Sequence, residues 1–305
     1  MKGSSTRDED FIEYIYIASM HDTMLLFTEK GRCHWLKVYD IPEGTRASKG
    51  RAVQNVINIA PDDRIRAYLN VKQLNDKEYA ENHYVVMCTA NGIIKKTSLE
   101  EYSRPRTNGV NAITVKDDDM LLTALITSGN SEILMAARNG KAIRFHESNV
   151  RAIGRTGVGV KGIEIDDDDR VVGMIAIEPD KKDDILVVSE NGYGKRSDLE
   201  DYRITNRGGK GVKTINITEK TGHLVAIKAV SDQNDLMIIN KSGITIRLSV
   251  DTLRIMGRAT QGVRVINLRN GDSIASVAVV PAQEDKDEQE GANEDVNETK
   301  PETEE

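Results

Sequence analysis

Residues 191–217 read NGYGKRSDLEDYRITNRGGKGVKTINI, and this stretch decides the fold. It opens with Asn191-Gly192, a dipeptide typical of a two-residue hairpin turn. A basic strand follows, then a less regular segment, then a box of glycines and cations from Arg207 to Gly211, and finally an alternating apolar run. A glycine-rich, basic box raises the question of which phosphate-bearing ligand it binds.

The same pattern occurs five times along the chain. The turn glycines of the five copies are Gly31, Gly92, Gly140, Gly192 and Gly243. The last four lie near 50 residues apart, which is the period of kelch-like blades. Each copy has an apolar lead strand, the turn, an alternating return strand, the box, a further alternating strand and a last apolar strand. Four strands per repeat with almost no helical periodicity predict an all-β, propeller-like ring of blades.

Cations recur at two places in each repeat. The return strands carry Lys95, Lys96, Arg144, Lys195, Arg196 and Arg247. The boxes and their flanks carry Arg46, Lys49, Arg51, Arg106, Arg155, Lys161, Arg207, Gly208, Gly209, Lys210, Gly211, Lys213, Arg258 and Arg264. One basic loop per blade would place positive charge at regular intervals on the rim of a disc. We predict that these residues bind duplex DNA, whose backbone carries about one charge per 1.7 Å.

The pattern favours binding to the DNA backbone over base recognition. Glycines allow close approach to phosphates and offer backbone N–H groups. No base-reading helix and no interleaved stacking aromatics are visible, so we expect sequence-tolerant binding in which the DNA bends. In the alternative, the glycines close tight turns and the arginines pair with nearby acids. That alternative accounts for a single loop equally well, but five loops in register favour a ligand.

Other kinds of site find little support. A Walker A loop needs Ser or Thr after its lysine and a helix after the loop, whereas a strand is expected after Gly211. The acidic stretches 117–119 and 166–169 lack EF-hand spacing and fall at a repeated turn, so we interpret them as turns. Trp35 is expected to pack rather than stack. The histidines, cysteines and carboxylates form no metal or catalytic pattern, so we expect neither catalysis nor a cofactor.

Charge divides the chain in two. The formal net charge is −7, and residues 283–305 contain eleven acids and two lysines, a net charge of −9. Residues 1–282 are therefore mildly basic and are predicted to form the folded domain. The acidic tail holds too little apolar surface to fold and is predicted to be disordered. Two unpaired cysteines, no apolar leader and no apolar run of membrane length predict a soluble, cytoplasmic chain.

Several long segments of the chain resemble the C-terminal domain of the DNA gyrase A protein. The segments GRCHWLKVYDIPEGTRASKGR, TANGIIKKTSLEEY, NGKAIRFHESNVRAIGRTGVGVKGI and ENGYGKRSDLEDY carry the resemblance, which covers residues 7–281. It implies a β-pinwheel of about six four-stranded blades that exchange strands with their neighbours. It also implies DNA wrapping around the basic rim in support of ATP-dependent negative supercoiling. The implied partners are double-stranded DNA, the catalytic part of gyrase A and the gyrase B protein, with no membrane involved.

The chain departs from the family pattern at two points. The family's full box, QRRGGKG, belongs to the first blade, and this chain begins just after the corresponding place, so we expect that blade to be incomplete. Arg207 to Gly211 is the nearest surviving match. The catalytic tyrosine domain is also missing, which implies a chain that neither cleaves DNA nor hydrolyses ATP. The topoisomerase IV C-terminal domain and a propeller-type protein scaffold remain alternative interpretations.

Overall fold

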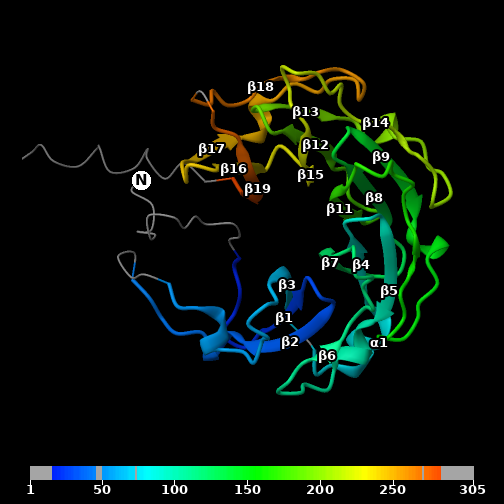
Figure 1. Ribbon diagram of the computed structural model, residues 1–305, viewed down its shortest axis with the longest axis vertical. Coiled ribbons are helices and arrows are strands. Elements are labelled where there is room, and N and C mark those ends of the chain that lie inside the picture. Colours follow the sequence, from blue (N-terminus) through cyan, green and yellow to red (C-terminus); the bar gives the residue numbers. More distant parts are fainter. Residues whose placement is uncertain (1–15, 46–49, 73, 270, 283–305) are drawn as a thin grey trace, which may run out of the picture.

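The computed structural model describes residues 16–45, 50–72, 74–269 and 271–282, which form five small antiparallel sheets arranged around an arc (Figure 1). The first sheet contains, in spatial order, β3 (Ile65–Val71), β1 (Thr23–Thr28), β2 (Arg32–Lys37) and β6 (Val110–Asn111). The second contains β7 (Leu121–Thr127), β4 (Tyr84–Thr89), β5 (Ile93–Ser98) and β10 (Val160–Lys161). The predicted all-β ring of blades is confirmed.

The remaining three sheets repeat this order. The third contains β11 (Val171–Ile177), β8 (Glu132–Ala137), β9 (Lys141–His146) and β14 (Val212–Lys213). The fourth contains β15 (Leu224–Val230), β12 (Asp184–Ser189), β13 (Tyr193–Ser197) and β18 (Val263–Arg264). The fifth has three strands, β19 (Ile274–Pro281), β16 (Asn234–Asn240) and β17 (Thr245–Ser249). About six blades were expected, and the described residues account for these five.

The hairpin turns follow the glycine pattern of the sequence. Gly192, between β12 and β13, has φ of 79°, a left-handed conformation that glycine adopts without steric cost. A Cβ at this position would lie 2.7 Å from the carbonyl oxygen of Ile266, which belongs to the next repeat. The turn glycine therefore closes the hairpin and also lets the next repeat pass directly against it.

Neighbouring repeats exchange one short strand, as the family resemblance implied. The two-residue strands β6, β10, β14 and β18 each pair with the return strand of the preceding repeat. In Figure 1 the strands β3, β7, β11, β15 and β19 line the inside of the arc, whereas β6, β14 and β18 lie on its outside. The exchange places the segment around each box at the outer edge of the ring.

Apolar packing between neighbouring sheets forms the core. Leu134 of β8 and Ile185 and Val187 of β12 belong to one buried cluster, although they lie in the third and fourth sheets. Comparable clusters join the first sheet to the second, the second to the third, and the fourth to the fifth. Because each of these clusters is shared between two sheets, every blade depends on a neighbour for part of its core.

Helical structure in the described residues is limited to short segments. Five 3₁₀ helices follow the return strands: Val38–Asp40, Leu99–Tyr102, Glu147–Asn149, Leu199–Asp201 and Val250–Thr252. A sixth spans Val53–Asn55. One α-helix, α1 (Lys77–Asn82), lies in the insertion after the first repeat, and the Asp76 side chain caps it by accepting from the Tyr79 N–H. Neither α1 nor the 3₁₀ turns were expected from the sequence.

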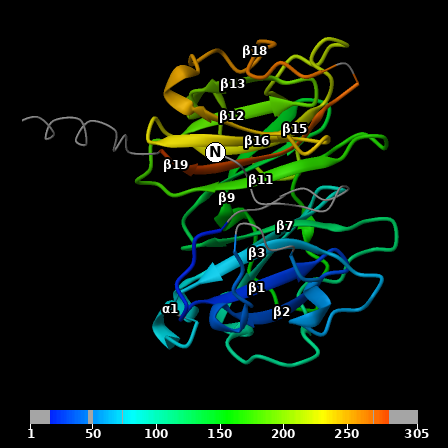
Figure 2. The same cartoon turned by 90° about the vertical axis from the view of Figure 1, so that its left-hand side faces the viewer.

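The described residues leave the arc open between the first and fifth sheets. Figure 2 views this opening, with β1, β2 and β3 below and β16 and β19 above. Within the described part, β17 pairs only with β16, so its outer edge lacks the exchanged strand that β5, β9 and β13 receive. No helix among these residues is long and apolar enough to cross a membrane.

Candidate nucleic-acid interface

The box loops of successive repeats lie side by side. The Thr114 N–H, after β6, donates to the Gly157 carbonyl in the next box at 3.2 Å. One repeat further on, the Glu164 N–H donates to the Gly209 carbonyl at 2.9 Å. These contacts, with a third between Asn216 N–H and Thr260 O at 3.1 Å, join four box regions along one edge.

The last glycine of the second to fifth boxes is required by close packing against the preceding sheet, whereas Gly50 in the first box has no such contact. Gly211 has φ of 70°, and an added Cβ would lie less than 3.0 Å from the Ala142 carbonyl oxygen in β9. Gly109, Gly159 and Gly262 have the same handedness and equally close contacts. By contrast, Gly209 has no neighbour closer to its Cβ position than Ile143 Cδ1, at 3.6 Å. The final box glycine is therefore a packing residue.

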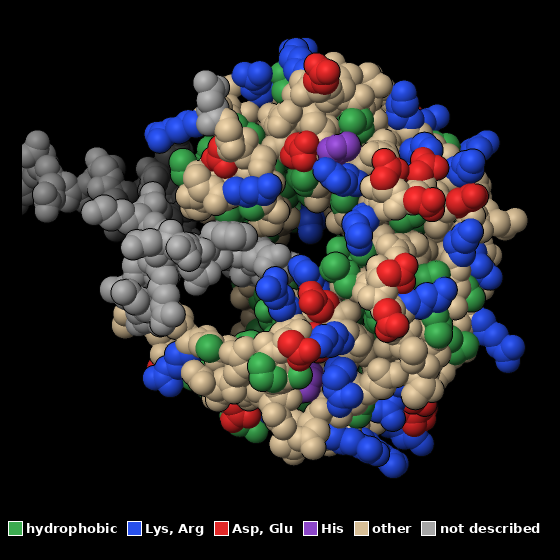
Figure 3. Space-filling view, in the orientation of Figure 1, with side chains coloured by type: hydrophobic (Ala, Val, Ile, Leu, Met, Phe, Trp, Pro, Cys, Tyr) green, Lys and Arg blue, Asp and Glu red, His purple; other side chains and the backbone are tan. Residues whose placement is uncertain are grey.

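Several predicted cations point to solvent along this edge. Lys161, Lys213 and Arg264 each occupy the second position of an exchanged strand, and all three are exposed. Exposure is shared by three further predicted residues, Arg51, Arg106 and Lys210. Within the described residues, none of these six has a carboxylate oxygen within ion-pair distance. Lys and Arg side chains line much of the outer contour in Figure 3, with acids interspersed on the face shown.

The box arginines serve partly to hold the loops together. The guanidinium of Arg207 donates to the carbonyls of Asn149 and Lys161, at 2.9 and 3.1 Å. That of Arg258 donates to the Lys213 carbonyl at 2.8 Å. Arg155 pairs with Glu101 at 3.3 Å. All three arginines are partly exposed, so each combines loop anchoring with positive charge at the surface.

The prediction that the return-strand cations contact DNA is wrong for Lys95, Lys96, Arg144, Lys195 and Arg196. All five side chains are buried. Lys96 pairs with Glu147, a carboxylate that is itself fully buried, at 3.0 Å. Lys95 and Lys96 are adjacent on β5 and therefore point to opposite faces of the sheet. Protein covers both faces here, so a cation on either face meets protein rather than solvent.

The buried arginines join one blade to the next. Arg144 pairs with Glu132 at 2.6 Å and donates to the Tyr202 carbonyl at 2.9 Å, beside the 3₁₀ helix of the following repeat. Arg196 likewise pairs with Asp184 at 2.6 Å and donates to the Val250 carbonyl at 3.1 Å.

Two positions differ from that pattern at the ends of the arc. In the first repeat the equivalent residue is Trp35, whose indole donates to the Tyr102 carbonyl at 2.8 Å, which confirms its packing role. Arg247, on the open edge of β17, is exposed and pairs with Asp235 at 2.6 Å. Arg46 and Lys49 lie outside the described residues.

A third recurring cation, not predicted from the sequence, precedes three of the boxes. Arg151, Arg203 and Arg254 each stand four residues before a box arginine, and all are exposed. The signal R-x-x-x-R-x-x-x-G is present in the third, fourth and fifth repeats. These arginines therefore belong with the exposed loop cations as candidates for ligand contact.

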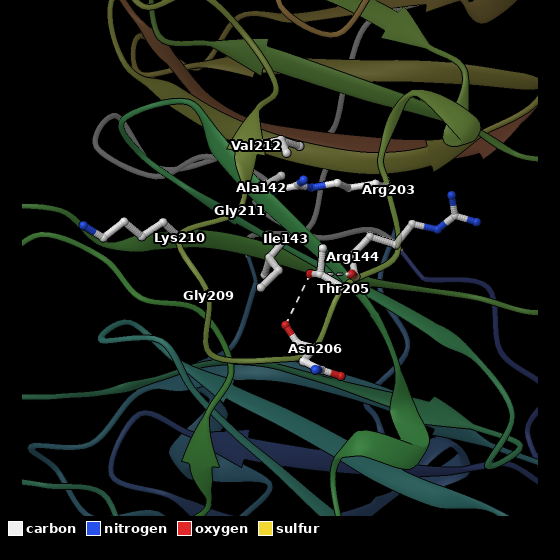
Figure 4. A pocket seen from close by; sticks show the side chains of 10 residues that line it. All are labelled: Ala142, Ile143, Arg144, Arg203, Thr205, Asn206, Gly209, Lys210, Gly211 and Val212. Carbon is white, nitrogen blue, oxygen red and sulfur yellow. Dashed lines mark hydrogen bonds between the residues drawn. The ribbon is translucent and has the colours of Figure 1, made fainter.

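A pocket of about 240 Å³ lies between β9 and the fourth box. Its lining includes Arg203, Thr205, Gly209 and Lys210, and Figure 4 shows the Lys210 side chain extending away from it. The loop leads into the strand β14 rather than a helix, so the Walker A alternative fails on the structure as well.

The acidic stretches are turns, as predicted. A carboxylate oxygen of Asp119 accepts from the Asn91 N–H at 2.9 Å, and one of Asp169 accepts from the Asn139 N–H at 3.1 Å. Both hold the hairpin turn of their repeat. No group of three or more His, Cys, Asp or Glu side chains suited to a metal occurs in the described part of the chain.

These features define a repeat protein of propeller type with a cationic outer edge, and comparison with known proteins identifies its family. The model of the DNA gyrase C-terminal domain, beta-propeller, matches residues 22–71, 83–128, 131–178, 183–231 and 234–281. The chain belongs to this family. Each of its five matched segments contains the three longer strands of one of the five sheets described above.

Curated relatives and solved structures agree with that assignment. The DNA gyrase A protein of Staphylococcus epidermidis is 43% identical over 285 residues, covering 93% of this chain and 32% of the relative. The Staphylococcus aureus gyrase A protein is 42% identical over 298 residues, covering 97% and 33%. The chain thus spans about a third of the length of these relatives.

Two solved structures share the fold. The C-terminal domain of DNA topoisomerase IV has a TM-score of 0.76 and 26% identity, covering 86% of this chain and 80% of that one. The DNA gyrase A C-terminal domain has a TM-score of 0.75 and 22% identity, covering 92% of both chains. The second likeness shows the fold alone.

Proposed function

We propose that this chain binds and wraps duplex DNA around its outer edge as a non-catalytic module of a type II topoisomerase. The observation that carries the proposal is the continuous edge of box loops, which presents exposed cations repeat after repeat. Such an edge suits a ligand whose charges are evenly spaced and whose bases need not be read. The gyrase A relatives support this assignment.

The wider role follows from the same family. In the complete enzyme, the wrapped segment would be presented for strand passage, with the catalytic part of gyrase A and the gyrase B protein as partners. ATP would be hydrolysed by gyrase B, and this chain would need no cofactor of its own. The acidic tail, which lies outside the described residues, would compete with DNA for the edge.

A gel-shift titration with long duplex DNA at two salt concentrations tests the binding. We expect binding that is insensitive to base sequence and that weakens steeply as salt rises, since each phosphate contact releases counterions. If long duplex fails to bind at low salt, the proposal is wrong and a protein-interaction scaffold is favoured.

Wrapping itself needs a second readout. A plasmid is relaxed in the presence of the chain and deproteinised, and its linking number is compared with that of plasmid relaxed alone. Wrapping with a fixed hand predicts a linking difference of one sign that grows with protein concentration. Binding without any linking difference would leave a DNA-binding module that does not wrap.

A further inference from the structure

From the second repeat to the fourth, one position on the return strand alternates between lysine and an apolar residue, whereas the first repeat has His34 there. It lies three residues after the turn glycine and holds Lys95 in the second repeat, Ile143 in the third and Lys195 in the fourth. Both lysine side chains are fully buried. Neither forms an ion pair within the described residues, which is an unusual situation for a buried ammonium group.

Backbone carbonyls of the outer edge receive these ammonium groups. Lys95 Nζ donates to the Ala112 carbonyl at 2.6 Å and to the Arg155 carbonyl at 2.5 Å. Ala112 directly follows the exchanged strand β6, and Arg155 begins the next box, so a single ammonium joins two successive loops. Lys195 Nζ donates at 2.6 Å to the carbonyl of Gly257, the residue before the box arginine Arg258.

An acid holds each of these loops from the other side. Glu101 and Asp201 occupy the same place in the 3₁₀ helices of the second and fourth repeats. A Glu101 carboxylate oxygen accepts from the Arg155 guanidinium at 3.3 Å, and an Asp201 oxygen accepts from the Arg258 N–H at 3.2 Å. Lysine, acid and box arginine thus form one recurring unit in alternate repeats.

The Arg207 loop, which lies between the Arg155 and Arg258 loops in the sequence, is held differently. Ile143 replaces the lysine and Asn149 replaces the acid in the third repeat, so the following box has no buried ammonium beneath it. There the Arg207 guanidinium itself reaches the carbonyls of Asn149 and Lys161. The Arg207 box therefore offers an internal control without titratable support.

We propose that Lys95 and Lys195 are positioning residues that fasten the Arg155 and Arg258 loops to the outer edge and hold them less tightly as pH rises. Charge-assisted hydrogen bonds are roughly twice as strong as neutral ones, so loss of the proton weakens the hold without abolishing it. The consequence for DNA rests on the proposed function, whereas the fastening of the loops does not.

The pH range in which the two lysines lose their protons suits a fastening that weakens as pH rises. Burial lowers the pKa of Lys95 to about 8, with nearby Glu101 opposing the shift and Arg155 adding to it. Burial likewise lowers the pKa of Lys195 to about 8, with Asp201 opposing and Arg258 adding. Both ammonium groups therefore lose their protons mainly between about pH 7 and 9.

Amide hydrogen exchange of the chain without DNA tests the fastening directly. Rates are corrected for intrinsic exchange and measured from pH 6.5 to 9.5 for residues 155–159, 207–211 and 258–262. We expect protection of the first and third segments to fall about tenfold through pH 8, with the middle segment unchanged. An equal response of all three segments, or no response in the outer two, would overturn the proposal.

Substitution of each lysine tests whether that residue causes the pH response of its loop. Lys95→Met should remove the pH response of residues 155–159 and lower their protection at every pH, and Lys195→Met should do the same for 258–262. The matched control Ile143→Met should leave all three loops unchanged. Should either lysine variant fail to fold, the wild-type pH profile still decides.

Measuring DNA affinity as a function of pH provides a separate test. If the positioned loops contact DNA, wild-type affinity declines between pH 7 and 9 more steeply than that of the Lys95→Met/Lys195→Met double variant. Parallel profiles would remove the link between these lysines and DNA, even if the exchange results hold. Complete lack of DNA binding by the wild type would defeat the proposed function but leave the exchange test intact.

Discussion

The return-strand cations and the loop cations recur equally regularly in the sequence, yet the structure places them in opposite environments. Arg144 and Arg196 lie between blades and pair with acids of their own lead strands. Lys161 and Lys213 lie on the outer edge and face solvent. Regular recurrence therefore shows only that a residue belongs to the repeat, and its surroundings decide between joining blades and binding a ligand.

The largest effect that would sharpen this comparison is expected at Lys96. Its partner Glu147 is fully buried and also accepts from the Thr127 hydroxyl at 2.8 Å and the Ser131 N–H at 2.6 Å. Lys96→Met would leave that carboxylate without its cation, at a cost of about 3–5 kcal/mol. Urea unfolding measures the loss. Lys161→Met, the loop control, should stay within about 0.5 kcal/mol of wild type.

Equal stability of these two variants would break the comparison, because it would mean that the buried pair contributes no more than an exposed lysine.

The second effect concerns DNA affinity and not stability. Replacing Lys161, Lys213 and Arg264 together by Gln should make the slope of log K against log salt shallower by about 2.7, at roughly 0.9 per phosphate. At 0.1 M salt this corresponds to a loss of affinity of at least about 100-fold. Fluorescence anisotropy with a labelled duplex gives both quantities.

A charge-matched control separates contact from overall charge. Lys77, Lys181 and Lys182 are exposed lysines outside the box regions. Their joint replacement by Gln removes the same charge and should leave the slope nearly unchanged. Similar slopes for the two triple variants would show that no particular edge guides the DNA.

A third, smaller effect tests the box glycines. Gly211→Ala should destabilise the fold by about 1–3 kcal/mol, since the residue needs positive φ and its Cβ would meet the Ala142 carbonyl. Gly209→Ala would place its Cβ in ordinary contact with Ile143 Cδ1, at 3.6 Å, and serves as the control within the same loop. Thermal melts compare the two. A tolerated alanine at Gly211 would contradict the packing role given to this glycine.

The smallest effect is expected from the acidic tail. Deleting residues 283–305 removes a net charge of −9 and should tighten DNA binding a few-fold at low salt, fading as salt screens the charges. Asp167→Asn with Asp168→Asn, in a structural turn, should alter neither affinity nor slope. Unchanged affinity of the tail deletion at low salt would refute competition by the tail.

Much of the fold was predictable from the sequence because hairpins leave local signals. The turn glycines and alternating strands located all five repeats. The exchanged strands were expected only from the family resemblance, since two residues such as Val160–Lys161 are too short to show a period of two. The helix α1 has only six residues and depends on tertiary contacts for its stability. A helix this short leaves no clear helical period in the sequence.

The site was predictable in part for a similar reason. The box loops can be recognised in the sequence by their glycines and cations. Alternation shows which residues share a face of a strand, but not that protein covers both faces of these strands, so the buried cations were assigned wrongly. A usable signal existed: an acid stands twelve residues before Arg144, Arg196 and Arg247, and each of these pairs forms an ion pair.

Lysine acetylation with a small amine-reactive reagent, read by mass spectrometry with and without saturating duplex DNA, tests the central claim most directly. We predict that Lys161, Lys210 and Lys213 react in the free chain and become protected by DNA. Lys95, Lys96 and Lys195 should remain unmodified in both states. Loop lysines that stay reactive while DNA is bound, or strand lysines that react freely and are then protected, would contradict the account.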